Sequence, residues 1–100
     1  FAIASVAPEI ESSRLIAAKA AVELLADSEV EASFVIYRDK NNTCISARSL
    51  GEVNVQLIME SMGGGGHQTM AACQLGEISF DEAEEMIIEK INLLCDKGEE

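Results

Sequence analysis

The first part of the chain shows a strand pattern followed by a helix pattern. Phe1–Val6 is a short run of apolar and small residues, ended by Pro8, which is typical of a strand. From Ser12 or Ser13, where Ser12 can cap the N-terminus, apolar residues recur at helical spacing as far as Asp27–Ser28. We expect the buried stripe of this helix to consist of Leu15, Ala18, Val22 and Leu25, with Ile16, Ala20 and Leu24 beside it.

The middle of the chain predicts an antiparallel hairpin. Residues 31–38 are rich in β-forming side chains, and residues 39–42 have the composition of a turn. In the following stretch, residues 43–48, apolar and polar positions alternate. Because successive strand residues face opposite sides, Cys44, Ser46 and Arg48 should share one face of the sheet.

A second helix, a glycine run and a third helix are expected in the remainder. Apolar spacing predicts a short helix from Val55 to Met62 that ends at Gly63, and residues 69–75 fit either a strand or a helical turn. Ser79 and Glu82 form a capping box, which marks the start of the last helix. Its apolar stripe is Phe80, Ala83, Ile87, Ile91 and Leu94; its solvated face is Glu82, Glu84, Glu85 and Glu89; and the tail, residues 97–100, should fray.

The expected element order is therefore β-α-β-β-α-β-α. This order predicts an α/β fold in which helices pack on a small mixed sheet, and we expect residues 1–100 to form one domain. The chain has no initiating Met and no charged signal-peptide start, so we expect it to be a piece of a longer protein.

Composition excludes several classes of function. Seven basic residues against 18 acidic ones give a net charge of −11, which disfavours binding to long nucleic acids and to anionic membranes. The longest apolar runs are too short to span a membrane. Cys44, Cys73 and Cys95 are widely spaced and only one histidine is present, so no metal-ligand pattern appears, and reduced cytoplasmic thiols are expected.

Two segments carry the candidate chemistry. The run Gly63–Gly66 would let a ligand approach the backbone, or offer consecutive amides as an anion nest, and His67 follows it directly. Arg48 and Ser49 provide a guanidinium and a hydroxyl that suit a phosphate. The alternatives are a flexible linker for the glycine run, a structural role for His67 and a strand-end salt bridge for Arg48. No spacing supports a catalytic triad, so the residues indicate a module that binds a phosphate-bearing ligand.

These motifs resemble the DHH-associated domain of the DHH phosphoesterase superfamily. Residues 63–72, with the upstream segment 45–49, match its glycine-run, histidine and Arg-Ser elements, although Cys73 replaces the usual glycine. The stretch 46–60 looks like the C-terminal domain of the membrane-bound cyclic-di-AMP phosphodiesterases of the GdpP type. The resemblance implies hydrolysis of cyclic di-AMP to pApA by two Mn²⁺ ions in a separate catalytic domain, with this fragment inactive alone.

The resemblance also implies roles for individual residues. Arg48 and Ser49 would bind a substrate phosphate, and the glycines of the run, with His67, would contact the nucleotide. Asn54 and Thr69 are weaker candidates for base or ribose contacts. The implied partners are the cyclic dinucleotide, the catalytic DHH domain of the same chain and, in a homodimer, a second copy. The implied setting is a cytoplasmic domain of a protein anchored in the bacterial membrane.

Two other classes remain open. Nucleases of the same superfamily act on single-stranded DNA or short RNA and share the Gly-His loop, but the charge of −11 argues against long polymers. The C-terminal domain of alanyl-tRNA synthetases is a binding and oligomerisation module, which usually has an arginine where this chain has His67.

Overall fold

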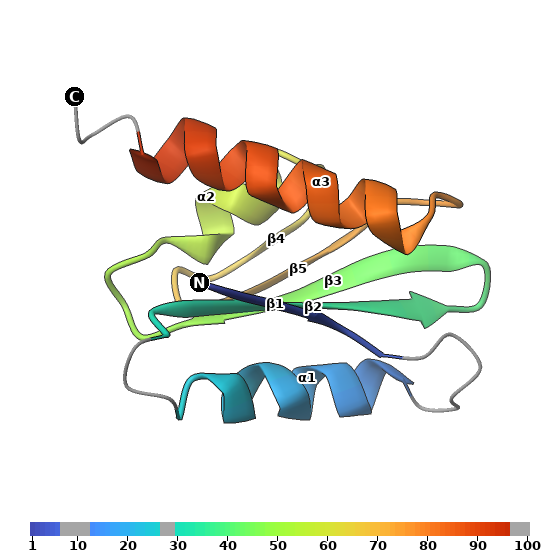
Figure 1. The fold of residues 1–100 in the computed structure, drawn as a ribbon, viewed down its shortest axis with the longest axis horizontal. Helices are drawn as coiled ribbons and strands as arrows, with labels where there is room; N and C mark the ends of the chain where they lie inside the picture. Colours follow the sequence, from blue (N-terminus) through green and yellow to red (C-terminus); the bar gives the residue numbers. More distant parts are fainter. Residues whose placement is uncertain (7–12, 27–29, 97–100) are drawn as a thin grey trace.

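The computed structural model describes residues 1–6, 13–26 and 30–96. Within them, one five-stranded mixed sheet lies between α1 on one face and α2 with α3 on the other (Figure 1). Strand order is β1-β2-β3-β5-β4, with β1 parallel to β2 and the other neighbours antiparallel. The elements are β1 (Ala2–Ser5), α1 (Ser13–Leu24), β2 (Ala32–Asp39), β3 (Asn42–Ser49), α2 (Val55–Glu60), β4 (Gly65–Gly66), β5 (Met70–Gln74) and α3 (Phe80–Ile91), followed by a π turn (Asn92–Asp96).

This architecture confirms the predicted α/β class and adds one element to the predicted order. Residues 70–74 form a strand, which decides between the two forms allowed for this segment. The glycine run contributes the extra strand, β4, at the edge of the sheet. The sequence did not predict β4, because glycine is depleted in strands and has no side-chain pattern.

The β2–β3 hairpin has the register that the alternation predicts. Asp39 pairs with Asn42 across the turn, and Lys40 in that turn has a φ of 59°. Ile45 and Ala47 belong to the main core, whereas Cys44 packs on the α1 side. Ser46 and Arg48 therefore share the α1 side of β3 with Cys44.

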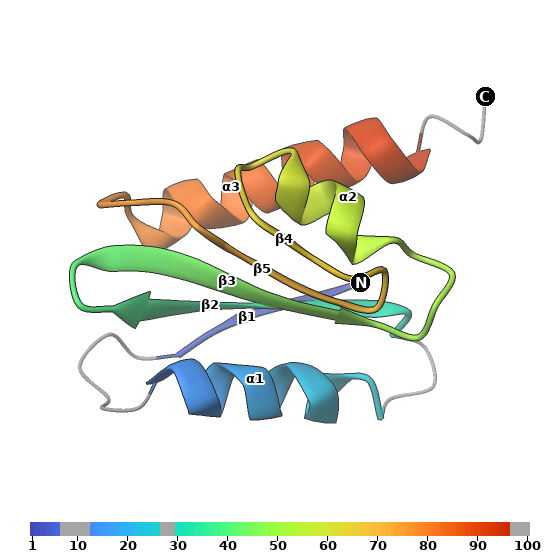
Figure 2. The ribbon, with the colours of Figure 1, turned by 180° about the vertical axis from the view of Figure 1, so that it is seen from behind.

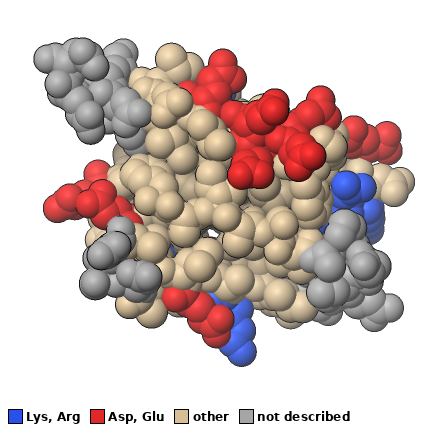
Figure 3. Space-filling model, viewed as in Figure 1, with Lys and Arg blue, Asp and Glu red and all other residues tan. Residues whose placement is uncertain are grey.

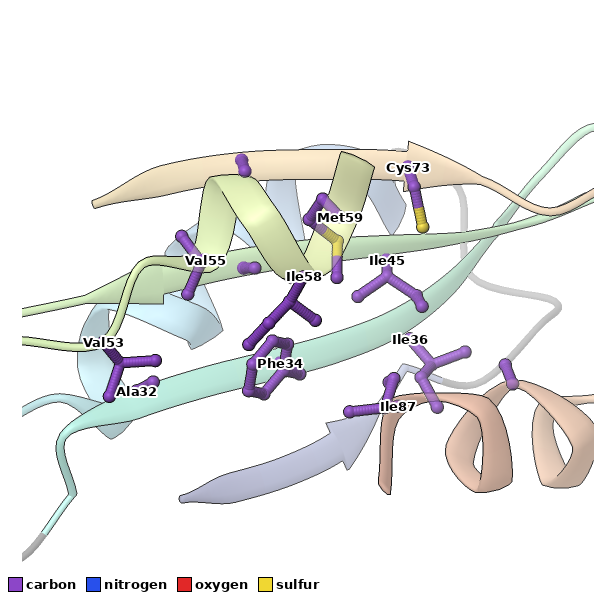
Figure 4. Packing of buried hydrophobic residues seen from close by; sticks show 13 residues of the cluster. Ala32, Phe34, Ile36, Ile45, Val53, Val55, Ile58, Met59, Cys73 and Ile87 are labelled. Atoms are coloured by element: carbon purple, nitrogen blue, oxygen red, sulfur yellow. The ribbon is translucent and has the colours of Figure 1, made fainter. Parts of the chain in front are cut away.

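The main core lies between the sheet and the α2–α3 layer. Figure 4 shows Phe34 of β2 beneath Ile58 of α2, with Ile45 and Ile87 in the same layer. Each of these four side chains is at most 1% exposed. Because each buried aliphatic or aromatic side chain contributes about 1.5–3 kcal/mol, this face holds most of the hydrophobic stabilisation.

The predicted stripe of α1 is wrong, because the helix presents a different face to the sheet. Ala17 and Ala21 are fully buried, whereas Leu15 is 73% exposed and Val22 is 50% exposed. Small residues at the contact let the helix axis approach the strands, and the hydroxyl of Ser33 donates to the carbonyl of Ala21 at 2.6 Å. Of the flanking residues, Ala20 and Leu24 pack on this contact and Ile16 is exposed. The proposed cap at Ser12 and the end at residues 27–28 lie outside the described residues.

The last helix begins as the sequence predicts and ends differently. Both hydrogen bonds of the capping box are present, from Glu82 N to Ser79 Oγ and from Ser79 N to Glu82 Oε1. Ala83 and Ile87 are buried, and Phe80 and Ile91 pack beside them. Leu94 is exposed, contrary to the prediction, because the wider turn over Asn92–Asp96 interrupts the α-helical spacing. The frayed tail, residues 97–100, falls outside the described part.

The acidic residues of α3 face solvent, as the sequence predicts. The four glutamates expected on the solvated face of α3 are exposed, and Figure 3 shows a row of carboxylates along this helix. In the described ranges, no helix has the length and apolar character that crossing a membrane requires.

Candidate functional site

The glycine run begins as the C-terminal cap of α2. Gly64 N donates to Met59 O at 2.8 Å and Gly63 N donates to Glu60 O at 3.1 Å. These are the two hydrogen bonds of a Schellman motif, with Gly63 in the left-handed conformation at φ 90°. The run therefore follows the helix and leaves it at a fixed angle, which places the next residues beside β5.

The other glycines of the run differ in what surrounds them. A Cβ on Gly64 would overlap the Ala72 carbonyl oxygen and Cys73, and a Cβ on Gly66 would overlap Ala71. A Cβ on Gly65 would meet nothing within 4 Å. Gly65 pairs with Ala72, which is exposed on the α1 side, so a side chain at Gly65 would project into the same open space.

Most amides of this segment are already hydrogen-bonded, so a nest of consecutive free amides is not formed. His67 N donates to Met70 O at 2.6 Å, and Met70 N returns a bond of 3.3 Å to His67 O. In an antiparallel ladder the hydrogen-bonded pairs alternate, so Gly65 pairs through its backbone and the N–H of Gly66 points to the sheet edge. One backbone donor therefore remains available beside His67.

Arg48 and His67 line the same pocket. The pocket has a volume of about 300 Å³ and lies on the α1 side of the sheet, where Ala18 of α1 forms part of its wall. Figure 2 shows β5 and β4 at the near edge of the sheet, with α1 below them. Gly65 and Gly66 complete the lining near His67, which is itself exposed.

The guanidinium of Arg48 is poised for an acceptor. Its Nε is buried and has no hydrogen-bond partner among the described residues. A buried donor without a partner is costly, and a guanidinium binds phosphate oxygens well. A phosphate oxygen in the pocket would satisfy this donor, so the unpaired Nε beside His67 indicates a ligand site.

Ser49, next to Arg48, faces the opposite side of the strand. Its hydroxyl accepts from Gly51 N at 3.1 Å and donates to Gln68 O at 3.5 Å, and its own N–H donates to Thr69 O. Ser49 thus holds the tip of the β4–β5 hairpin, and Thr69 lies exposed in that tip. The structure brings together Arg48 and His67, but it does not place the Ser49 hydroxyl with them.

Asn54 is occupied as the N-cap of α2. Its Oδ1 accepts from Gln56 N at 3.0 Å and from Leu57 N at 3.3 Å. The base or ribose contact expected of Asn54 remains a prediction, but in this structure its side chain stabilises the helix that precedes the glycines.

A second pocket adjoins the first and was missed by the sequence reasoning. It has a volume of about 350 Å³, and Tyr37 and Ala72 line both pockets. Asp39 of β2 and Gln74 of β5 lie at its far side. The alternation of β5, in which Met70, Ala72 and Gln74 are exposed, is the signal that could have found this open half of the sheet.

The described part of the chain holds no metal-binding cluster. In residues 1–6, 13–26 and 30–96, no three His, Cys, Asp or Glu side chains lie close enough to bind an ion. Cys44 and Cys73 are free and buried, and burial, together with the neighbouring Cys44, raises the pKa of the Cys73 thiol from 9.0 to about 12.

Comparison with known proteins agrees with these features. A family model described as the DHHA1 domain matches residues 1–93. The chain is 55% identical to the cyclic-di-AMP phosphodiesterase GdpP of Bacillus subtilis (strain 168), covering 97% of this chain and 15% of that protein. It is 48% identical to the cyclic-di-AMP phosphodiesterase PdeA of Listeria monocytogenes, covering 98% of this chain and 15% of that protein. The chain thus spans about 15% of the length of these relatives.

Solved structures support the fold. An exopolyphosphatase-related protein from Bacteroides fragilis superposes with a TM-score of 0.72 at 19% identity, covering 84% of this chain and 24% of that chain. A pGpG-specific phosphodiesterase from Vibrio cholerae gives a TM-score of 0.59 at 21% identity, covering 73% and 27% respectively. At these identities the likeness establishes the shared architecture.

Proposed function

The chain belongs to the DHHA1 domain family, and we propose that it is the substrate-binding part of a cyclic-di-AMP phosphodiesterase. In this proposal, the groove between α1 and the β3–β5–β4 half of the sheet binds one phosphate of the dinucleotide. The buried, unpartnered Nε of Arg48 is the observation that carries it. The names of the two similar phosphodiesterases supply the substrate class.

Each residue of the pocket has a distinct part in this proposal. The Arg48 guanidinium donates to a phosphate oxygen, and the ring of His67 donates to the same phosphate or to the adjoining nucleoside. Because Gly65 has no side chain, the ligand can lie against the backbone of β4. Ser49 acts as a positioning residue, since its hydroxyl donates to Gln68 O and its N–H donates to Thr69 O in the hairpin tip that carries His67.

We assign hydrolysis of the dinucleotide to another part of a longer protein. The described residues hold no cluster that could bind the metal ions of a two-metal reaction. We therefore expect the 100-residue chain to bind the dinucleotide without cleaving it. We place this domain on the cytoplasmic side of a membrane-anchored parent, in contact with its catalytic domain.

Calorimetric titration of the chain with cyclic di-AMP, cyclic di-GMP and pApA tests the proposal. Arg48→Met should weaken cyclic di-AMP binding about 10-fold or more, because a hydrogen bond to a charged group is worth about 1.5–3 kcal/mol. Arg48→Lys should recover part of this loss, since it keeps the charge but not the planar fork.

Lys90→Met is the matched control, because it removes one positive charge from α3 on the other side of the sheet. Equal affinities for the wild type and Arg48→Met would refute the site. Tight binding of short oligonucleotides, without binding of the cyclic dinucleotide, would instead favour the nuclease class.

A further inference from the structure

We propose that the pocket lined by Tyr37, Asp39 and Gln74 is a second-base subsite, in which Gln74 recognises adenine. This inference rests on the proposed function, because it extends the ligand from the Arg48 pocket along the same groove. The two similar phosphodiesterases are named for the dinucleotide that they hydrolyse. The proposed subsite adds which residues of this chain would bind the second base of such a ligand.

The groove has the shape that a two-unit ligand needs. The second pocket, about 350 Å³ in volume, shares Tyr37 and Ala72 with the Arg48–His67 pocket, so the two are continuous along the sheet. Cross-strand register fixes their order, since Arg48 pairs with Met70, and Cys44 pairs with Gln74 four residues further along β5. Two adjoining compartments suit a ligand with two nucleotide units.

The two compartments differ in charge. Among the described lining residues, Arg48 is the charged group of the first pocket and Asp39 is that of the second. A carboxylate repels a phosphate and accepts a hydrogen bond from an amino group. The phosphate therefore belongs at the Arg48 end, and a base with an exocyclic amine belongs at the Asp39 end.

Gln74 has the side-chain chemistry to recognise adenine. Its side chain is exposed on the groove side of β5. A primary amide offers one donor and one acceptor, which match N7 and the N6 amine of adenine as a bidentate pair. Asp39 can accept the second hydrogen of the N6 amine.

The wall of this compartment allows a flat base to enter. Gly63 and Gly64, which carry no side chain, line the other side of the pocket. Tyr37 lies in the floor of both compartments and offers a ring surface at their junction. A base in the second compartment would therefore lie on the α1 face of the sheet, beside the backbone of Gly63 and Gly64.

A nitrogen-15 NMR titration of the 100-residue chain tests the assignment with two ligands, pApA and AMP. Both should shift the Arg48 Nε–H resonance, because both bring a phosphate to the first pocket. Only pApA, which has a second base, should shift the side-chain amide of Gln74 at saturation. Gln74→Met should weaken pApA binding about tenfold and leave AMP binding within twofold, since a bidentate base contact is lost.

Gln56→Met is the matched control, because Gln56 lies on α2 and its side-chain amide donates to Glu60 at the surface. A Gln74 amide that stays unshifted by saturating pApA would overturn the subsite. So would a Gln74→Met variant that weakens AMP as much as pApA. If Arg48→Met abolishes binding of both ligands while Gln74→Met changes neither, the proposed function stands and the subsite fails. If neither ligand shifts Arg48 Nε–H, both proposals fail.

Discussion

Two neighbouring glycines should respond in opposite ways to the same added methyl group. In Gly64→Ala the new Cβ overlaps the Ala72 carbonyl and the Cys73 backbone, neither of which can rotate away. In Gly65→Ala the new Cβ meets nothing within 4 Å, and the φ of Gly65 lies outside the left-handed region, so alanine can adopt it. Comparing the two variants therefore distinguishes two effects. Gly64→Ala reports on packing of the glycine run against β5, and Gly65→Ala reports on contact between the run and a ligand.

The magnitudes follow from these surroundings. Overpacking costs about 1–3 kcal/mol, which for a domain of this size lowers Tm by about 4–8 °C per kcal/mol. Gly65→Ala should change stability little or raise it by about 0.4–1 kcal/mol, because alanine restricts the unfolded chain. For ligand binding we expect Gly65→Ala to be the harmful change, since its methyl group projects into the Arg48–His67 pocket.

Thermal unfolding followed by circular dichroism, with calorimetric titration of cyclic di-AMP, measures both effects on the same samples. We expect a lower Tm for Gly64→Ala, and an unchanged or higher Tm with weaker binding for Gly65→Ala. A Gly64→Ala variant as stable as the wild type would show that the strands can separate freely and would refute the packing argument. Unchanged binding by Gly65→Ala would show that the ligand does not approach β4.

Three further predictions concern stability. Ser79→Ala removes the capping box of α3 and should cost about 1 kcal/mol in a urea titration, whereas full stability would mean that water replaces the cap. The pKa of the Cys73 thiol is near 9 in the unfolded chain and about 12 in the folded protein, so the free energy of unfolding should fall as pH rises through this window. The free energy of unfolding of Cys73→Ala should fall less over the same range. Equal pH slopes for the two proteins would contradict the raised pKa. Ala21→Leu should destabilise by about 1–3 kcal/mol and Val22→Gln by less than about 0.5, and the reverse order would contradict the observed face of α1.

Sequence reasoning succeeded where structure depends on local chemistry. The capping box needs only Ser79 and Glu82 at the right spacing, and the alternation of β3 follows from the pleat of a strand. The structure also brings Arg48 and His67, which residue type alone indicates, to one pocket, and their roles in binding stay predictions. These inferences required no knowledge of which elements touch.

It failed where tertiary contact decides. The face of α1 depends on how closely the helix approaches β2, and a close approach favours Ala17 and Ala21 over the larger Leu15 and Val22. The adjacency of Arg48 and Ser49 suggested a shared ligand, but neighbours in a strand face opposite sides. The compartment at Gln74 depends on strand order, which no local pattern encodes.

The uneven covering of the sheet has a consequence for how such a domain can diverge. Its main core lies on the face against α2 and α3, whereas the groove lies on the other face, beside β5, whose side chains there remain exposed. Substitutions at Met70, Ala72 or Gln74 can therefore alter what is recognised while the scaffold persists. A lineage built on this plan can acquire a new ligand by exchanging a few outward residues of one strand, with little loss of thermal tolerance.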